Sequence, residues 1–417
     1  MKVLIIGSGG REHAICWAFS KSKKVNKIYC ANGNAGISQV AECVNIKPDE
    51  IDKLAEFAQK EKIDLTFVGG ETSLALGIVD EFENQGLKII GVSQKTAQLE
   101  SSKAFAKNFM ARHQIPTAKY KVANSTAEAE SYLNDFGENV VIKADGLAAG
   151  KGVVVCQTQT EAVSAINELE AIVGADAISQ IVLEERLIGK EVSLLLFSDG
   201  KNFAQMPPVR DHKRIGEGDS GANTGGMGTF SDDGLLSKEQ LQKITTEIIK
   251  PTLEGCETEG FPLRGILFLG LMMTETGAKV LEYNIRFGDP ETQSILVRLE
   301  TDLLDICEAI LNQTLDKLEL NWKKGSSACV VLASKNYPGK PQTGDKISGL
   351  ENIKEAIVFH AGTNKNEAGD FLTSGGRVLG ITATGENLEQ ALNTAYEAVN
   401  KISWDGMQYR RDIGKTI

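Results

Sequence analysis

The segment that most restricts the fold of this chain is a glycine-rich loop between two β-branched runs. Residues 140–155 begin with Val-Val-Ile and end with Val-Val-Val, and Gly146, Gly150 and Gly152 stand between these runs. Glycine lets backbone N–H groups approach an anion closely, and Lys143 and Lys151 add positive charge beside them. The pattern predicts a β-hairpin that closes over a phosphate group. A glycine-rich turn with two solvated lysines is the alternative.

A P-loop is another glycine-rich phosphate-binding element, and two features of this segment argue against it. Lys151 is followed by Gly152, where a P-loop requires Ser or Thr. The chain then continues into a strand-like run, whereas a P-loop leads into a helix. We therefore interpret the segment as a hairpin lid over a nucleotide.

Length and charge limit the classes of protein that remain. At 417 residues and 45.0 kDa the chain is too long for one hydrophobic core, so about two to four domains are expected. The net charge of −11 gives no overall field that would attract nucleic acid or an anionic membrane. An anionic nucleotide must then be held by local lysines and arginines.

The cysteines and the start of the chain bear on the compartment. The seven cysteines are scattered and never spaced as Cys-x-x-Cys, which indicates reduced thiols. The first apolar run, Val3–Ile6, is too short for a signal peptide, and no later run is long enough to cross a bilayer. We expect a cytoplasmic protein without a membrane or nucleic-acid partner.

The first hundred residues alternate between strand and helix patterns, as in an α/β fold. Strands are predicted at 3–6, 27–30, 65–68 and 88–90, and helices at 11–20, 49–61 and 73–85. Gly7 and Gly9 separate the first strand from the first helix, but Glu12 occupies the third glycine position of a dinucleotide fingerprint. This start favours a smaller phosphorylated ligand over a dinucleotide.

The rest of the chain divides into three further parts. The predicted boundaries are 1–103 for a Rossmann-like domain, 104–122 with 190–325 for a central domain, 123–189 for a lid subdomain, and 326–417 for a small α/β cap. Strands are predicted at 140–143, 153–156, 181–185, 192–197, 203–206, 264–272, 279–284, 328–333, 356–360 and 377–382. Helices are predicted at 104–122 in part, 160–173, 237–256 and 387–401.

A strand at 279–284 carries a candidate metal pair. The period of two along a strand places Glu282 and Asn284 on one face. Mg²⁺ takes one or two protein oxygens when phosphate and water supply the others, so this pair suffices if ATP is bound. Two polar residues on an exposed strand face are the simpler interpretation. A charged loop, residues 286–292, follows the strand and favours a ligand site.

Residues 211–228 contain a charged tetrapeptide and then six glycines in thirteen residues. So many glycines disfavour a regular element, and we expect a mobile or anion-wrapping loop. His212 is either a proton carrier or a structural residue. Arg286 is either a group that stabilises a phosphoryl or carboxylate charge or one partner of a surface ion pair.

Taken together, these segments resemble the ATP-grasp ligases and, among them, the phosphoribosylamine–glycine ligase family. The resemblance rests on the lid, on Glu184-Glu-Arg-Leu187, on Glu282-x-Asn284, and on strings found nearly from end to end. These strings are 7–13, 33–36, 211–214, 223–228, 284–293 and 375–379. It implies an ATP-grasp fold of class α/β, with an N-terminal Rossmann-like parallel-sheet domain and a small C-terminal α/β cap domain.

The resemblance also implies a reaction and a set of ligands. Glycine, phosphoribosylamine and ATP would give glycinamide ribonucleotide, ADP and phosphate through a glycyl acyl phosphate, with Mg²⁺ or Mn²⁺ bound. The implied oligomeric state is a monomer or a weak homodimer. The family usually carries Pro where this chain has Gly70 and Ala222, and these changes loosen turns without removing reactive groups.

Residue by residue, the resemblance implies the following site. Metal ligands are Glu282 and Asn284, and catalytic residues are Arg286, Lys213 and Asp211. ATP contacts are Lys103, Lys143, Gly146, Ala149, Gly150, Lys151, Gly152, Glu184, Glu185, Arg186, Leu187, Glu191 and Asn223. Substrate contacts are Gly9, Gly10, Asn34, Glu71, Gly226 and Asp289.

Three rival functions remain open at this point. A biotin-carboxylase-like enzyme would share the lid and the metal pair but use bicarbonate. A nicotinamide-dependent dehydrogenase is favoured only by the N-terminal glycines, and Glu12 argues against it. A non-catalytic nucleotide sensor is disfavoured by the intact pair Glu282 and Asn284.

Overall fold

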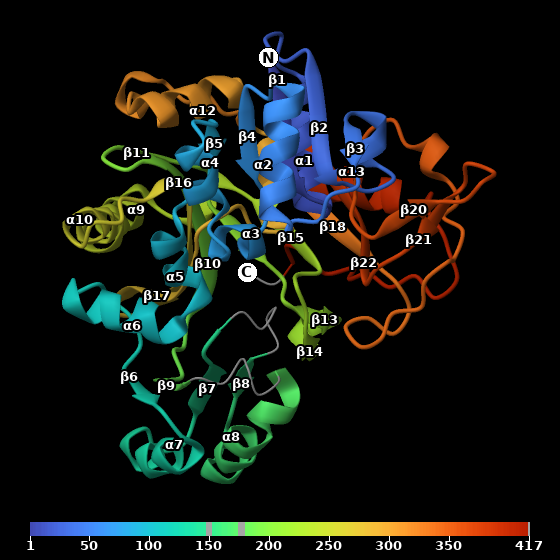
Figure 1. Cartoon of the computed structure of the whole chain (residues 1–417). Coiled ribbons are helices and arrows are strands. Elements are labelled where there is room, and N and C mark those ends of the chain that lie inside the picture. The colour runs from blue at the N-terminus through green and yellow to red at the C-terminus, as the bar shows by residue number, and fades with distance from the viewer. Residues whose placement is uncertain (147–151, 174–179, 416–417) are drawn as a thin grey trace.

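The N-terminal part is a five-stranded parallel sheet with the strand order β3-β2-β1-β4-β5 (Figure 1). The structure is a computed structural model that describes residues 1–146, 152–173 and 180–415. The elements are β1 (Lys2–Gly7), α1 (Gly10–Ser20), β2 (Lys27–Asn32), β3 (Glu42–Val44), α2 (Ile51–Glu61), β4 (Leu65–Val68), α3 (Glu71–Ala75), α4 (Ile78–Asn84) and β5 (Ile89–Ile90). The predicted parallel α/β sheet is confirmed.

One predicted helix of this domain, 73–85, is wrong in its extent. The structure has two short helices, α3 and α4, separated at Gly77, whose φ is +86°. This left-handed conformation suits glycine and ends one helix before the next begins. Glu71, the first residue of α3, lies just after β4 and contacts Arg286 of the central domain.

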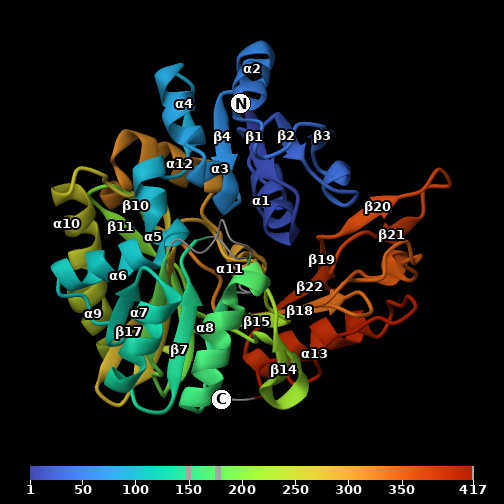
Figure 2. The same cartoon turned by 60° about the horizontal axis from the view of Figure 1, so that its bottom comes forward.

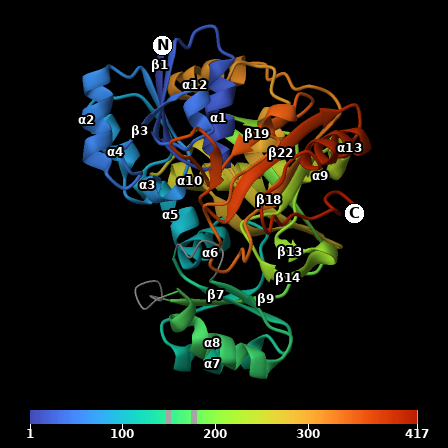
Figure 3. The same cartoon turned by 90° about the vertical axis from the view of Figure 1, so that its right-hand side faces the viewer.

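The predicted lid hairpin is present in a separate four-stranded antiparallel sheet with the order β6-β9-β7-β8. Its elements are α5 (Gln94–Ser101) and α6 (Lys103–Arg112), which lead in, then β6 (Tyr120–Ala123), α7 (Thr126–Tyr132), β7 (Val140–Ala144), β8 (Val153–Val155), α8 (Gln159–Val173) and β9 (Ile181–Glu185). In the hairpin, Lys143 pairs with Val153. Figure 3 shows this sheet below the main body. Three predicted ATP contacts, Ala149, Gly150 and Lys151, lie outside the described residues.

The largest sheet has nine strands and runs from the central part into the C-terminal part. Its path is β17-β16-β10-β12-β15-β18-β22-β19, and β11 pairs with β10. The bounds are β10 (Lys190–Asp199), β11 (Phe203–Gln205), β12 (Val209–Asp211), β15 (Gly228–Ser231), β16 (Arg264–Thr274), β17 (Gly277–Asn284), β18 (Ser326–Ala333), β19 (Ile357–His360) and β22 (Arg377–Gly385). The predicted strands of both parts therefore join into one sheet, and the boundary near residue 326 crosses it.

Helices cover this sheet, and a small hairpin projects from it. The helices are α9 (Lys238–Ile244) and α10 (Lys250–Thr258) with a π-helical turn, Thr245–Ile249, between them, and α11 (Glu291–Leu296), α12 (Leu303–Asn312) and α13 (Leu388–Val399). The hairpin consists of β20 (Thr363–Lys365) and β21 (Phe371–Thr373). In Figure 2 the N-terminal, central and C-terminal parts meet around α11. In the described part of the chain, no helix has the length and apolar character needed to cross a membrane.

The expectation of an irregular loop at 216–228 is wrong for its first half. Residues 214–223 form a hairpin of β13 (Arg214–Gly216) and β14 (Ser220–Asn223). Gly218 and Gly221 have φ values of +65° and +80°, so glycine here permits the turn and the irregular pairing instead of preventing a strand. Arg410 anchors the hairpin, since it donates to the carbonyl of Arg214 and to the carboxylate of Asp219.

The N-terminal domain contacts the C-terminal part through buried polar residues. His13 of α1 accepts a hydrogen bond at Nδ1 from the amide of His360 at 2.8 Å. Asn34 donates to the carbonyls of Ser8 and His360 and accepts from the amides of Gly36 and Ile37. Burial lowers the pKa of His13 to about 3 and that of His360 to about 4.

We expect the free energy of unfolding to fall as the pH drops below about 6.5, the pKa of an unperturbed histidine. His13, His212 and His360 are buried, and each has a lowered pKa in the fold. The unfolded chain therefore binds more protons than the fold does at acidic pH, and each histidine contributes a loss of about 2 kcal/mol at pH 5. Urea unfolding at pH 7.5 and pH 5 measures this loss.

His360→Asn is the matched variant for this prediction, because Asn retains a hydrogen-bonding group near the Nδ1 position that contacts Thr363. We expect its loss between the two pH values to be smaller than that of the parent by about 2 kcal/mol. An identical pH dependence in parent and variant would contradict the assignment of the loss to buried histidines.

Candidate functional site

The predicted ATP and metal residues meet where the lid sheet faces strands β10 and β17. Lys143 of β7 lies 3.5 Å from the carbonyl oxygen of Leu281 on β17, measured from Nζ. Lys103, the first residue of α6, donates to the carbonyl of Gly146 at 2.9 Å. The lid lysines and the metal pair therefore border the same space, although they come from different sheets.

A buried carboxylate sets the position of the lid lysine. Glu184 of β9 lies between Lys107 and Lys143, at 2.9 Å and 2.8 Å from their Nζ atoms. Burial opposes ionisation of Glu184, but the two lysines prevail and keep its pKa below the ordinary value. Burial lowers the pKa of Lys107 to about 8. The Glu184 side chain is thus directed at lysines, whereas the sequence predicted an adenine contact.

The segment that follows β9 is the predicted adenine hinge. Glu185 accepts hydrogen bonds from the amide of Lys119 and from Nζ of Lys279, at 2.9 Å and 3.1 Å. Arg186 is exposed and Leu187 is half-buried. The hinge therefore offers backbone groups and an apolar side chain, while the carboxylates of this strand are used within the protein.

Asp145 connects the base of the lid to helix α6. Its carboxylate accepts from the Ser102 hydroxyl at 3.0 Å and from the Ala104 amide at 3.1 Å, so it caps the helix from another element. Ser102 itself caps the amide of Phe105 at 3.0 Å. The first turn of α6, which carries Lys103, is in this way fixed to the lid.

We expect Asp145→Ala to lower the free energy of unfolding by about 1 kcal/mol, the usual cost of losing a helix cap. The Michaelis constant for ATP should also rise, because Lys103 is no longer held against Gly146. Urea unfolding and ATP titration of the rate test both effects. A variant that loses stability with an unchanged constant for ATP would limit Asp145 to a structural role.

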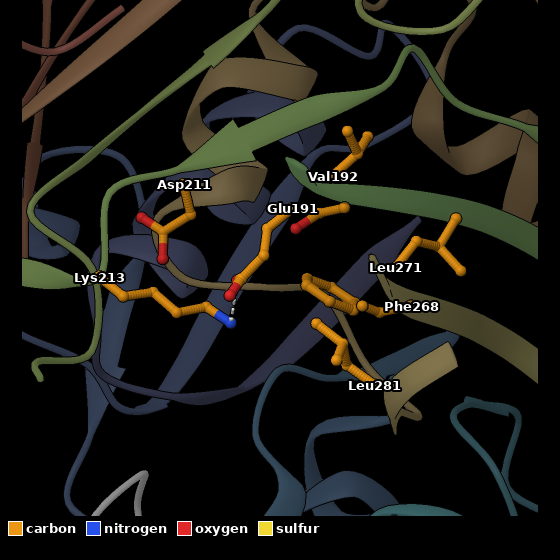
Figure 4. A pocket seen from close by; sticks show the side chains of 9 residues that line it. Glu191, Val192, Asp211, Lys213, Phe268, Leu271 and Leu281 are labelled. Atoms are coloured by element: carbon orange, nitrogen blue, oxygen red, sulfur yellow. Dashed lines mark ion pairs between the residues drawn. The ribbon is translucent and has the colours of Figure 1, made fainter. Parts of the chain in front are cut away.

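Lys213 lies between two carboxylates of the site, and Figure 4 shows its ion pair with Glu191. Lys213 Nζ lies 3.0 Å from Oε2 of Glu191 and 3.9 Å from Oε1 of Glu282. Glu191, Asp211, Lys213 and Leu281 line a narrow pocket here, together with Val192, Ser193, Phe268, Gly270 and Leu271. Burial opposes the charge of Lys213, but the surrounding carboxylates prevail and raise its pKa. Lys213 is therefore a permanent cation in the site.

A β-bulge in strand β17 lies next to the predicted metal pair. Gly270 of β16 pairs with Glu282 and the next residue, Leu271, pairs with Val280, so Leu281 is the additional residue. The Glu282 side chain is half-exposed, and Asn284 is partly exposed on the same side. Partial burial would raise the pKa of Glu282, but neighbouring lysines outweigh it and lower the pKa. An ionised carboxylate and an amide oxygen suit a hard divalent cation.

No group of three or more His, Cys, Asp or Glu with metal-binding geometry occurs among the described residues. The predicted metal site therefore consists of two oxygen-bearing side chains, those of Glu282 and Asn284. This number fits Mg²⁺ or Mn²⁺ only when a phosphate-bearing substrate completes the coordination.

Arg286 is held in the site by two carboxylates. Its guanidinium lies 2.6 Å from Glu100 and 3.2 Å from Glu71, and it donates to Oδ1 of Asn284 at 3.2 Å. Glu100 also accepts from the amide of Ile285 at 3.0 Å. The surface ion pair considered for Arg286 is wrong, because the side chain is 16% exposed and lies next to the metal pair.

The junction between the N-terminal and central domains brings together the predicted ribosylamine residues. A Cβ added to Gly9 would lie 3.2 Å from Oδ2 of Asp289, and one added to Gly10 would lie 2.6 Å from Nε2 of Gln293. Asp289 pairs with Arg377 at 3.2 Å. Only glycine lets the start of α1 approach this close to α11.

Two of the candidate residues have their polar side-chain groups used within the protein. The Asn34 amide makes four hydrogen bonds to backbone groups, which uses its full capacity. His212 contacts the carbonyl of Gly228 through Nδ1 and accepts from the amide of Gly414 through Nε2. Burial lowers the pKa of His212 to about 4. The proton-carrier interpretation of His212 is wrong, and the residue is structural.

Of the remaining predicted residues, Gly226 contacts the site. Gly226, with φ +107°, backs onto Asp211, because an added Cβ would lie 2.8 Å from its Oδ1. Asn223 is exposed on β14. Gly152 is buried at the start of β8.

Sequence reasoning missed Lys107, Glu100, Arg377 and Glu291, which all contact or approach the residues above. Lys107 follows Lys103 by one helical turn on α6, and this spacing was a usable signal. Arg377 lies in the string 375–379, but its pairing with Asp289 could not be predicted, and Glu100 carried no local signal, since its partner Arg286 is distant in the sequence. Their roles follow only from the fold.

Comparisons with known proteins cover nearly the whole chain. Residues 1–100 match the N domain of the phosphoribosylglycinamide synthetase family, residues 101–292 its ATP-grasp (A) domain and residues 327–416 its C domain. A phosphoribosylamine–glycine ligase of Caldanaerobacter subterraneus subsp. tengcongensis is 49% identical over 99% of both chains.

Solved structures also match nearly the whole length of the chain. The phosphoribosylamine–glycine ligase of Thermotoga maritima superposes with a TM-score of 0.85 at 34% identity, covering 99% of this chain and 100% of that one. The biotin carboxylase domain of Hydrogenobacter thermophilus 2-oxoglutarate carboxylase gives a TM-score of 0.73 at 16% identity, covering 98% and 91%. The second likeness shows a common fold alone.

Proposed function

The chain belongs to the phosphoribosylglycinamide synthetase family, and from this premise we propose which of its residues bind each substrate. Its activity is the ATP-dependent ligation of glycine to 5-phosphoribosylamine in purine biosynthesis. The products are glycinamide ribonucleotide, ADP and phosphate. The observation that carries the residue assignment is the meeting of Lys103, Lys143, Glu282 and Arg286 around one space.

The reaction has two steps. A carboxylate oxygen of glycine attacks the γ-phosphorus, the bond to the β-phosphate oxygen breaks, and ADP leaves. The amine of phosphoribosylamine then attacks the glycyl carbonyl, phosphate leaves, and the nitrogen loses a proton. Because such steps need correct placement of three ligands, positioning can supply about 7–11 kcal/mol of the barrier reduction.

Lys103 and Lys143 hold the ATP phosphates beneath the lid. Glu184 holds Lys143 in place through an ion pair and shares its carboxylate with Lys107, so positive charge remains in this cluster. We assign Gly146 and Gly152, the described ends of the lid loop, to the phosphates. The adenine lies against the backbone of residues 184–187 and the side chain of Leu187, and Glu191 and Asn223 lie toward the ribose and the phosphates.

Glu282 and Asn284 hold the divalent cation, Mg²⁺ or Mn²⁺. Their oxygens stand on one side of β17, and their number fits a cation that shares the ATP phosphates. When bound, the cation neutralises charge on the transferring phosphoryl group. Lys213 keeps Glu282 ionised and adds a second positive charge.

Arg286 faces the charge that develops at the transferred phosphoryl group and at the glycine carboxylate. Its fork is oriented by Glu71 and Glu100, so little reorganisation is needed at the moment of reaction. Gly9, Gly10, Asp289 and Gly226 surround the place of phosphoribosylamine, and Asn34 shapes the adjoining loop through its backbone contacts.

The proposal extends to the compartment and the oligomeric state of the protein. We assign it to the cytoplasm as a monomer or a weak homodimer. The cysteines among the described residues are free thiols, which suits a reducing compartment.

The test of the activity is ADP formation with purified protein. We expect release of ADP that requires glycine and phosphoribosylamine together, and a product with the mass of glycinamide ribonucleotide. Turnover with bicarbonate and biotin, and none with glycine, would overturn the assignment and favour a carboxylase. ATP binding without any turnover would favour a nucleotide sensor.

A further inference from the structure

Glu291 is an acid in the site whose negative charge has no partner. Its residue is 6% exposed at the start of α11. Within the described part of the chain, its carboxylate makes no ion pair or hydrogen bond with another residue, in contrast to Asp289 two positions earlier. Burial without an ion pair is costly and raises the pKa of Glu291, so a cation supplied by a ligand would stabilise its ionised form.

A second acid, Asp211, lies beside the same loop. Oδ1 of Asp211 would be 2.8 Å from a Cβ on Gly226, and that Cβ would touch Pro290 at 2.5 Å. Oε2 of Glu291 would be 2.3 Å from a Cβ on Gly288. Asp211 therefore lies beside the segment that carries Glu291, and burial together with the charge of Glu291 raises the pKa of Asp211.

The cations that face this pair are already committed to other acids. Lys213 pairs with Glu191 and Arg377 pairs with Asp289. Arg286 is held by Glu71 and Glu100. His212, the immediate neighbour of Asp211, stays neutral because burial lowers its pKa. The pair thus remains open to a cation supplied by a ligand.

Among the three substrates, glycine is the one with a permanent positive charge at neutral pH. ATP is an anion, and phosphoribosylamine joins a phosphate to a weakly basic amine. A small ammonium group can donate three hydrogen bonds, which two carboxylates accept without a large cavity.

We propose that Asp211 and Glu291 bind the α-ammonium group of glycine. This inference rests on the proposed function, because it assigns a subsite for one of its substrates. With the ammonium held there, the glycine carboxylate is free to face Lys213 and Arg286. The site would then select amino acids over other small carboxylic acids through the ammonium group.

The test compares Glu291→Gln with the parent in steady-state kinetics. We expect the Michaelis constant for glycine to rise at least about 30-fold, the lower range for loss of one buried charge partner. The constant for ATP should stay within about threefold, because its contacts are elsewhere. Glycolate, which replaces the ammonium with a hydroxyl, should keep its inhibition constant against glycine.

Two further variants separate binding from folding. Glu291→Asp keeps the charge and should recover part of the glycine affinity. Glu367→Gln makes the same change at an exposed position in the hairpin turn, and should leave all constants unchanged. Unfolding midpoints of the variants show whether the fold is intact.

The possible results distinguish a failure of the glycine subsite from a failure of the proposed function. A parallel rise for glycine and glycolate, or an unchanged constant for glycine, would overturn the subsite. A rise in the Mg²⁺ requirement with an unchanged constant for glycine would also overturn it, because the acids would then hold a metal. Lack of glycine-dependent ADP release in the parent would instead reject the proposed function.

Discussion

Glu282→Ala abolishes measurable ligation while the protein stays folded. The substitution removes one of the two protein oxygens available to the divalent cation, and losses of about 10²–10³-fold in kcat accompany removal of a single charge-stabilising group. The side chain is half-exposed, and its nearest cation, Lys213, is 3.9 Å away, so the fold does not depend on it. ADP release and the urea unfolding midpoint measure the two effects separately.

Glu282→Asp and Glu367→Ala are the controls. The aspartate retains a carboxylate one methylene further from the cation, and we expect partial activity that rises with the concentration of Mg²⁺ or Mn²⁺. Glu367→Ala removes an exposed carboxylate far along the chain and should change neither rate nor stability. Full activity of Glu282→Ala in Mg²⁺ would refute the metal assignment.

Arg286→Lys is expected to lower kcat by about 10³-fold, as when an arginine that stabilises phosphoryl charge is lost. Lysine keeps the positive charge next to Glu71 and Glu100 but cannot reproduce the planar fork that contacts both acids and Asn284. The stability should therefore change little while the chemical step slows. Single-turnover formation of ADP isolates that step.

Arg286→Met gives the complementary result. It leaves the buried carboxylate of Glu100 without its cation, and burial already raises the pKa of this group. Such a loss costs about 3–5 kcal/mol of stability. If Arg286→Lys kept the rate within about threefold, the arginine would be a structural anchor and its assigned role in phosphoryl transfer would be wrong.

Local patterns were sufficient for most of the secondary structure. The β-branched runs on either side of the lid loop predicted the hairpin, and β7 and β8 pair as expected. The apolar runs of the first ninety residues predicted the parallel sheet. The errors occurred at glycines, because glycine can either end a regular element or form its turn. Gly77 divides the helix that was expected at 73–85, and glycines form the turn of a hairpin within 214–223, where a loop was expected.

The parts of the candidate site that were predictable consist of residues close together in the sequence. Glu282, Asn284 and Arg286 share one strand end and do lie together. Pairings across the fold were not predictable, because Glu184 with Lys107 and Arg286 with Glu100 depend on how separate elements pack. The same packing decided the role of His212, whose ring contacts a carbonyl and the chain near its C-terminal end.

The continuity of the large sheet has a consequence for shortened versions of the protein. Strand β18 is bonded on one side to β15 and on the other to β22, so it lies in the sheet interior. A chain cut at residue 325 would leave β15 as a bare edge with unpaired backbone groups. Such an edge recruits strands from other molecules, so the remaining three quarters of the protein would self-associate instead of behaving as an independent enzyme core.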